Sequence, residues 1–87
     1  MKFEYDSAKS ESNKAKHGID FEEAKALWKD DDRLNIPTAY EDEERYALIG
    51  RIGLRHWTAI ITYRGEVIRI ISVRHSRKEE IDLYEED

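Results

Sequence analysis

The chain has 87 residues, which is room for a single domain, over residues 1–87, with one hydrophobic core. It contains no cysteine, so disulfides and thiolate metal sites are excluded, and stability must come from packing and hydrogen bonds. No apolar run approaches the roughly 20 residues of a membrane span, and the N-terminus lacks the pattern of a secretory signal. We therefore expect a soluble cytoplasmic protein that does not enter a membrane.

Charge is segregated along the sequence, although the formal net charge is only −5. Residues 1–20 balance four basic against four acidic side chains, and residues 21–44 carry three basic against nine acidic ones. Residues 45–78 carry eight basic side chains and one acidic one, Glu66, whereas residues 79–87 carry six acidic side chains and no basic one. Seven of those eight basic residues are arginine, whose planar fork of donors binds phosphate. A phosphate-bearing ligand is therefore expected there, unless these side chains are only solvated strand edges that deter aggregation.

The chain begins with a pattern that predicts a strand and then a helix. Residues 2–5 alternate polar and aromatic side chains, which indicates a short strand. Asp6 is a suitable N-cap for a largely exposed helix that runs to about His17. Gly18 stands where a left-handed C-terminal cap belongs.

A second helix and an acidic turn are expected next. Asp20 and Glu23 have the spacing of a capping box, and the apolar residues that follow form one stripe at helical spacing. This helix should dock on the core and end near Lys29. Residues 30–32 are three consecutive aspartates, which we interpret as a turn because the Gly and the distal Glu of a calcium loop are missing. We expect no metal site.

Three later segments are typical of strands. β-Branched and aromatic residues dominate residues 46–52, 57–63 and 67–73. Arg64-Gly65-Glu66 separates the last two segments and predicts a hairpin turn. The three segments therefore predict an antiparallel β-meander.

Shorter elements flank this meander. Residues 34–36 predict a short strand, and Pro37 keeps it out of a central position before a loop over residues 37–44. Ser76 and Glu79 have capping-box spacing for a short C-terminal helix. The predicted fold class is α+β, with helices over one face of the sheet and the other face open to a ligand.

Four blocks of sequence carry a resemblance to a known family. They are Phe3-x-Tyr5-Asp6 with Lys9 and Asn13, the run from Lys16 to Ala24, Glu44-Arg45 with Gly50, and the run from Ile68 to Arg74; Glu80 and Tyr84 near the end also match. In this order and spacing they resemble the BrnT family of bacterial toxins over nearly the whole chain. One departure is that His75 and Ser76 follow Arg74, where family members commonly carry Arg and Ala.

The resemblance implies a single BrnT-like toxin domain with a RelE-like fold, in which an N-terminal strand and two helices precede an antiparallel meander and a short C-terminal helix. It also implies the toxin of a type II toxin–antitoxin system, an endoribonuclease that inhibits translation by cutting RNA, free or on the ribosome. The implied partner is a BrnA-like ribbon-helix-helix antitoxin. The toxin is expected to contact promoter DNA only indirectly, through this antitoxin. No cofactor is implied.

The candidate catalytic residues follow from how RNA can be cut without a metal. A base takes the proton of the 2′-hydroxyl, an acid protonates the leaving 5′-oxygen, and cations stabilise the phosphate. We expect these groups to come from Arg74, His75, Arg77, Lys16 and His17. His75 is the preferred acid or base, whereas His17 either caps its helix or takes part in catalysis.

Five further residues are candidate RNA ligands: Arg45, Arg51, Arg55, Arg69 and Tyr84. Arg69 and Arg74 are five residues apart, so a regular strand sends them to opposite faces, and only a bulge or the end of the strand brings them together. Arg69 is either a structural partner of an acidic residue or catalytic, and Arg45 either binds phosphate or pairs internally. Tyr84 either packs in the last helix or, as RelE-like toxins imply, lies near the substrate.

Two other readings of the charge pattern stay open. The chain is alternatively a non-enzymatic module that binds RNA or a protein through a basic sheet face. The acidic segments 39–44 and 79–87 would attract a basic antitoxin surface and repel RNA.

Overall fold

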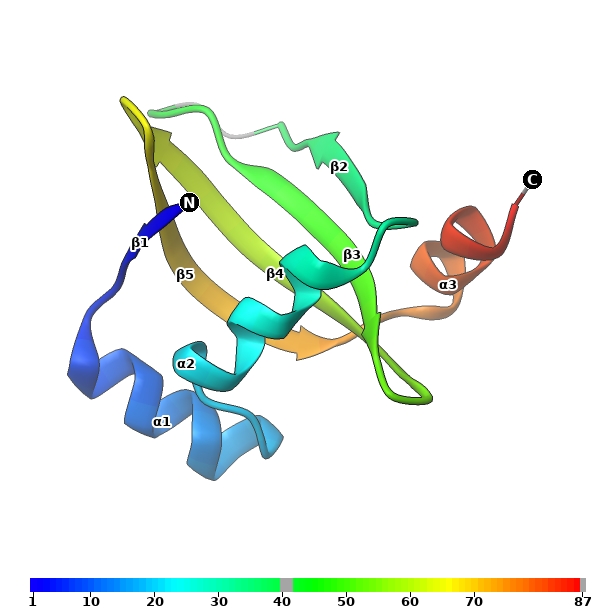
Figure 1. Ribbon diagram of the computed structural model, residues 1–87, viewed down its shortest axis with the longest axis horizontal. Coiled ribbons are helices and arrows are strands. Elements are labelled where there is room, and N and C mark those ends of the chain that lie inside the picture. Colours follow the sequence, from blue (N-terminus) through cyan, green and yellow to red (C-terminus); the bar gives the residue numbers. More distant parts are fainter. Residues whose placement is uncertain (40–41, 87) are drawn as a thin grey trace.

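The computed structural model describes residues 1–39 and 42–86 of the chain (Figure 1). The elements are β1 (Lys2–Glu4), α1 (Ser7–His17), α2 (Phe21–Ala24), the 3-10 helix η1 (Lys25–Lys29), β2 (Leu34–Pro37), β3 (Tyr46–Ile52), β4 (Arg55–Arg64), β5 (Val67–His75) and α3 (Lys78–Glu85). The predicted α+β class is confirmed. No helix in the described part of the chain is long and apolar enough to cross a membrane.

Five strands form one sheet in the order β1-β5-β4-β3-β2. The antiparallel meander predicted for β3, β4 and β5 is confirmed, and Pro37 lies in the edge strand β2, as its missing N–H requires. β1, however, pairs with the outer edge of β5 in parallel. The sheet is therefore mixed and not a pure meander as expected, because side-chain alternation identifies a strand without specifying its neighbour.

The first helices begin and end at the predicted capping residues. Asp6 accepts hydrogen bonds from the two N–H groups at the start of α1, and Gly18 ends that helix at a φ of 82°. Asp20 and Glu23 form the predicted capping box of α2. The segment ends at Lys29 as expected, but its second half is the 3-10 helix η1.

The C-terminal helix begins one residue later than predicted. Its N-cap is Arg77, whose backbone N–H donates to Glu80 at 2.8 Å. Ser76 does not cap the helix because its hydroxyl is bonded to Thr58 at 2.8 Å. The predicted box of Ser76 and Glu79 is thus wrong, while the helix itself is confirmed.

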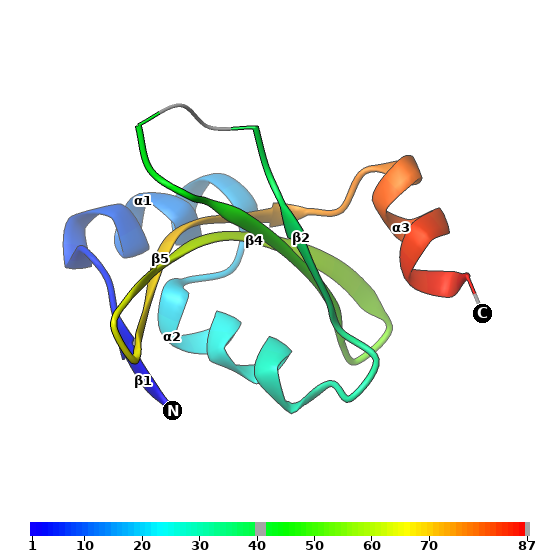
Figure 2. The ribbon, with the colours of Figure 1, turned by 90° about the horizontal axis from the view of Figure 1, so that it is seen from above.

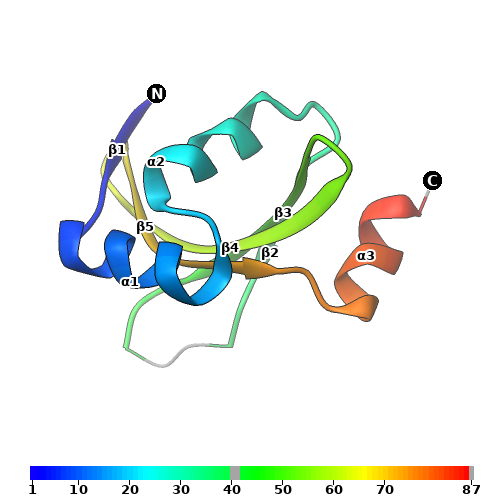
Figure 3. The same ribbon diagram turned by 90° about the horizontal axis from the view of Figure 1, so that it is seen from below.

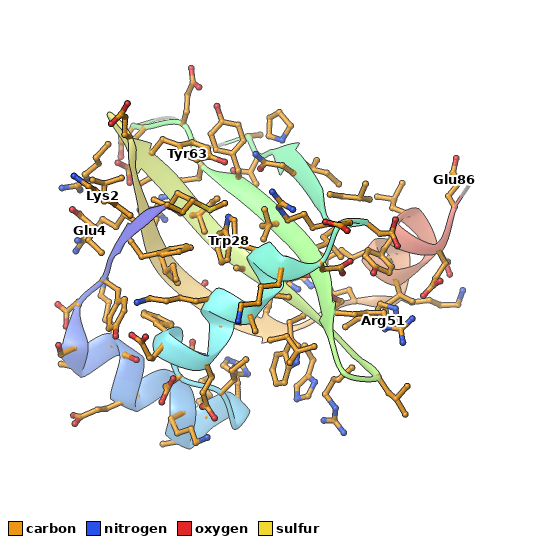
Figure 4. All side chains as sticks on the ribbon, viewed as in Figure 1. Lys2, Glu4, Trp28, Arg51, Tyr63 and Glu86 are labelled. Atoms are coloured by element: carbon orange, nitrogen blue, oxygen red, sulfur yellow. The ribbon has the colours of Figure 1, made fainter. Side chains whose placement is uncertain are left out.

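The hydrophobic core lies between the curved sheet and the segment formed by α2 and η1, which runs beneath it in Figure 2. Phe21 and Leu27 are fully buried there, and Trp28 lies between η1 and the sheet (Figure 4). Gly50 on β3 permits this close approach, since a Cβ atom at that position would lie 3.1 Å from Leu27 Cδ2.

α1 is attached to the sheet by polar side chains instead of an apolar stripe. The Asn13 side-chain amide donates to the carbonyls of Ile19 at 2.8 Å and Val73 at 2.9 Å, and its oxygen accepts from the Val73 N–H at 3.2 Å. β1 covers the edge of β5 only as far as Arg69. Asn13 therefore satisfies the edge of β5 beyond the point where β1 has ended.

Asn13 gives the first testable prediction. Asn13→Ala leaves one buried N–H and two carbonyls without their partner, so we expect a loss of about 2–4 kcal/mol in the free energy of unfolding. Urea unfolding measures this loss, and Ser12→Ala, one residue away on the exposed side of α1, is the control. A loss below about 0.5 kcal/mol would show that water replaces the amide.

Candidate active site

A bulge in β5 decides which side chains share a face of the sheet. The pairing with β4 passes from Ile61–Ile70 to Ile60–Ser72, so Ile71 is an extra residue. Without the bulge Arg69 and Arg74 would point to opposite faces; with it both lie on the face away from α2 and η1. The bulge that the sequence analysis required to bring Arg69 and Arg74 to one face is therefore present.

These strand arginines are nevertheless occupied within the molecule. Arg69 contacts Glu4 at 2.8 Å, and Arg64 lies 3.9 Å from the same carboxylate. Arg45 contacts Glu43 at 3.2 Å. Arg51, at the end of the sheet towards α3 in Figure 4, donates to the Gly53 carbonyl at 3.3 Å. The sheet face therefore does not present a set of unengaged guanidinium groups.

Arg74 makes the strongest of these pairs. Its two terminal nitrogens donate to the two carboxylate oxygens of Glu80 at 2.8 and 2.9 Å. Thr58 Oγ1, at 3.0 Å, and the Arg77 N–H, at 2.8 Å, donate to the same carboxylate. Burial would raise the pKa of Glu80, but these hydrogen bonds outweigh it and lower the pKa to about 2.

Five other basic side chains come from the elements that meet at one end of the sheet. They are Lys16, His17, Arg55, His75 and Arg77, and we call this set the basic end. Within the described residues none of the five makes a side-chain hydrogen bond or ion pair; the ring of His75 only stacks on Trp57, at 4.3 Å between centroids. Four of them are among the predicted catalytic residues, and Arg55 is a predicted RNA ligand.

α1 brings two members of the basic end to β5. β1 is parallel to β5, and α1 continues in that direction beside the second half of β5 (Figure 1, Figure 3). Beyond the Asn13–Val73 contact, His17 lies one helical turn and His75 two strand residues further on, about 6 Å in each case. His17 is also on the same face of α1 as Asn13, because four residues separate them. His17 and His75 are thus displaced by a similar distance, in the same direction along β5, from the Asn13–Val73 contact.

The remaining two members are Arg55, where β4 begins, and Arg77, two residues after β5 ends. Trp57 pairs with His75, and the Ser76 N–H donates to the His56 carbonyl at 3.1 Å. Arg55 and Arg77 are each one residue beyond this hydrogen bond. The chain thus brings Arg55, His75 and Arg77 to the same end of the β4–β5 pair, and α1 runs beside β5 towards that end with Lys16 and His17 in its last turn.

Tyr84 on α3 is engaged by Asp30, at the end of η1, and not by a member of the basic end. Its hydroxyl donates to Asp30 Oδ2 at 2.7 Å, and burial together with this hydrogen bond raises the pKa of Tyr84 to about 12. The same oxygen accepts from the Arg51 N–H at 2.8 Å. Asp30, interpreted from the sequence only as part of a turn, thus joins η1, β3 and α3. No local pattern distinguishes it from the two aspartates that follow.

Side chains suitable for a metal ion do not gather in the described part of the chain, where no three His, Cys, Asp or Glu residues form a group that could hold one. The aspartate run at residues 30–32 is a turn, as predicted. The chemistry available at the basic end is that of imidazole, ammonium and guanidinium groups.

The low pKa of Glu80 gives a prediction for stability. A carboxyl whose pKa falls from 4.5 to about 2 on folding stabilises the fold above pH 4.5, and this contribution disappears as the pH falls towards 2. We expect Glu80→Gln to cost up to about 3 kcal/mol at neutral pH and little at pH 2. Unfolding free energies measured across this range test it; a deficit independent of pH would contradict the assignment.

Comparison with known proteins identifies the family. The model of the family described as "Ribonuclease toxin, BrnT, of type II toxin-antitoxin system" matches residues 5–80 of the chain. A search of curated proteins found no significant match. The matched region includes α1, the whole sheet beyond β1, and all five members of the basic end. Membership of such a family implies an RNA substrate and an antitoxin partner. The chain therefore belongs to the BrnT family of ribonuclease toxins of type II toxin–antitoxin systems.

Proposed function

We propose that this toxin is a metal-independent endoribonuclease and that the basic end is its active site. The observation that carries the proposal is a difference between two groups of cations. Arginines of the sheet face contact carboxylates or a carbonyl, whereas Lys16, His17, Arg55, His75 and Arg77 have no such partner among the described residues. A polyanion that the net charge of −5 repels at a distance can bind only where cations are locally unpaired.

The proposed chemistry uses the RNA's own 2′-hydroxyl. One histidine of the basic end takes the hydroxyl proton while the 2′-oxygen attacks phosphorus; the bond from phosphorus to the 5′-oxygen breaks, and the other histidine protonates that oxygen. A cyclic phosphate and a 5′-hydroxyl result. Arg55 and Arg77 stabilise the negative charge on phosphorus-bound oxygens, and Lys16 adds a third cation. The stack on Trp57 fixes the plane of the His75 ring.

The biological role that we propose follows the family. Cutting RNA inhibits translation in the cytoplasm, and a BrnA-like ribbon-helix-helix antitoxin neutralises the toxin and links it to promoter DNA. The order of one strand and two helices before a mostly antiparallel sheet supports the RelE-like fold that the resemblance implies. The acidic, exposed side of α3 is a suitable contact for a basic antitoxin surface, although the predicted docking segments include residues 40, 41 and 87, which lie outside the described part.

Cleavage assays on purified protein test the catalytic assignment. We expect chelator-resistant cleavage of single-stranded RNA, lowered about 10²- to 10⁴-fold by His17→Ala or His75→Ala. Lys16→Ala should also lower it, and Lys9→Ala is the matched control because Lys9 is exposed at the other end of α1. RNA that is bound but stays intact would indicate a non-enzymatic binding module instead.

Salt dependence of binding separates the basic end from the sheet face. The logarithm of the binding constant falls linearly with the logarithm of the salt concentration, and each lost phosphate contact makes this slope shallower by about 0.7 for single strands. We expect this decrease for Arg55→Ala and Arg77→Ala with an uncleavable 2′-O-methyl oligonucleotide, and none for Arg69→Ala, whose guanidinium contacts Glu4. An equal effect of Arg69→Ala would assign binding to the sheet face.

A further inference from the structure

The donors around Glu80 form a built anion-binding site. One carboxylate receives a two-pronged guanidinium, the Thr58 hydroxyl and the backbone N–H of Arg77, all between 2.8 and 3.0 Å. Ser76 supplies a second hydroxyl, bonded to Thr58 at 2.8 Å. A guanidinium fork with a hydroxyl and a main-chain N–H is also a donor set that recognises a phosphate group. The anion that fills it here belongs to the chain itself.

This site lies at the surface and next to the basic end. The side chains of Arg74 and Glu80 are 24% and 16% exposed, so the pair is not sealed in the core. Arg74 and His75 are adjacent on β5 but point to opposite faces of the sheet, so the link to the basic end is Arg77, whose backbone N–H donates to Glu80. Removal of the Glu80 carboxylate would therefore add one more guanidinium to the positive charge already present there.

The helix that carries Glu80 is held by polar contacts. α3 has no buried residue, and Leu83 is 46% exposed. Beyond Glu80, its attachments include Tyr84 to Asp30 at 2.7 Å, Glu85 to His56 at 2.7 Å, and an edge-on contact of the Tyr84 ring with the His56 ring at 5.2 Å between centroids. A helix of eight residues is too short to be stable without such contacts. Four acidic residues against Lys78 give α3 a negative charge of its own.

The geometry points to a phosphate-binding site formed by Arg74, Thr58 and the Arg77 N–H, which α3 closes by placing the Glu80 carboxylate where a phosphodiester of RNA binds. α3 is thus an internal competitor of the substrate. The inference rests on the proposed function, since RNA is the phosphate source it names. RNA binds in full only to molecules whose α3 has moved away, so the fraction of closed molecules weakens the apparent affinity.

Binding of an uncleavable 2′-O-methyl oligonucleotide, followed by fluorescence anisotropy at low salt, tests this inference. Glu80→Gln keeps the size of the side chain and removes its charge. Glu79→Gln is the control, because it removes the same charge from an exposed neighbour whose side chain makes no hydrogen bond or ion pair within the described residues. We expect Glu80→Gln to bind at least about tenfold more tightly than Glu79→Gln. Adding Arg74→Gln should abolish the gain.

A second variant covers the case in which Glu80→Gln does not fold. Glu85→Gln breaks the contact with His56 and leaves Arg74 and Glu80 intact, and we expect a smaller gain in affinity from it. Inorganic phosphate, titrated in parallel, separates the two sources of the anion: a gain for phosphate but not for the oligonucleotide would overturn RNA as the ligand. Equal affinities of Glu80→Gln and Glu79→Gln would overturn the site.

The binding experiment on α3 and the cleavage assay can fail separately. If wild-type protein cleaves RNA and neither variant gains affinity, the proposed function stands and the closed site is rejected. If wild-type protein fails to cleave RNA but Glu80→Gln gains affinity through Arg74, the site stands and the catalytic assignment is rejected.

Discussion

The side-chain amide of Asn13 joins three backbone groups, two of which belong to Val73, 60 residues further along the sequence. It completes the hydrogen bonding of β5 where β1 has ended, and it fixes the loop after α1 through the Ile19 carbonyl. Because α1 has no apolar stripe, this amide and the Ser10 hydroxyl, which accepts from the Phe21 N–H, determine where the helix lies. The position of Lys16 and His17 beside the end of β5 depends on them.

The distribution of carboxylates then decides where the molecule is effectively positive. Glu4, Glu43 and Glu80 neutralise arginines along the sheet, so the excess of basic residues over the second half of the sequence does not become a broad basic face. Among the arginines of residues 45–78, those left without a carboxylate or carbonyl partner in the described part of the chain are Arg55 and Arg77, which lie at the same end of the sheet as His75. An acidic protein can in this way have a small site for a polyanion, with little general affinity for nucleic acid.

Local features of the fold were predictable from the sequence, and non-local ones were not. Asp6, Gly18 and the box of Asp20 and Glu23 act within one helical turn, so their spacing suffices to place the helix ends. The parallel position of β1, the bulge at Ile71 and the contacts of Asp30 and Asn13 depend on partners far along the chain, which a single sequence does not specify. Residue chemistry predicts four of the five members of the basic end as catalytic candidates and Arg55 as an RNA ligand, but it does not predict the engagement of Arg74 by Glu80.

The central claim is that RNA binds at the basic end. Its most direct test is a titration of isotope-labelled protein with an uncleavable 2′-O-methyl oligonucleotide, followed by backbone amide chemical shifts in solution. If RNA binds there, the largest changes occur in residues 16–18, 55–57 and 74–77. Changes confined to β2 and to the sheet face around Arg69, with residues 16–18 unaffected, would contradict it.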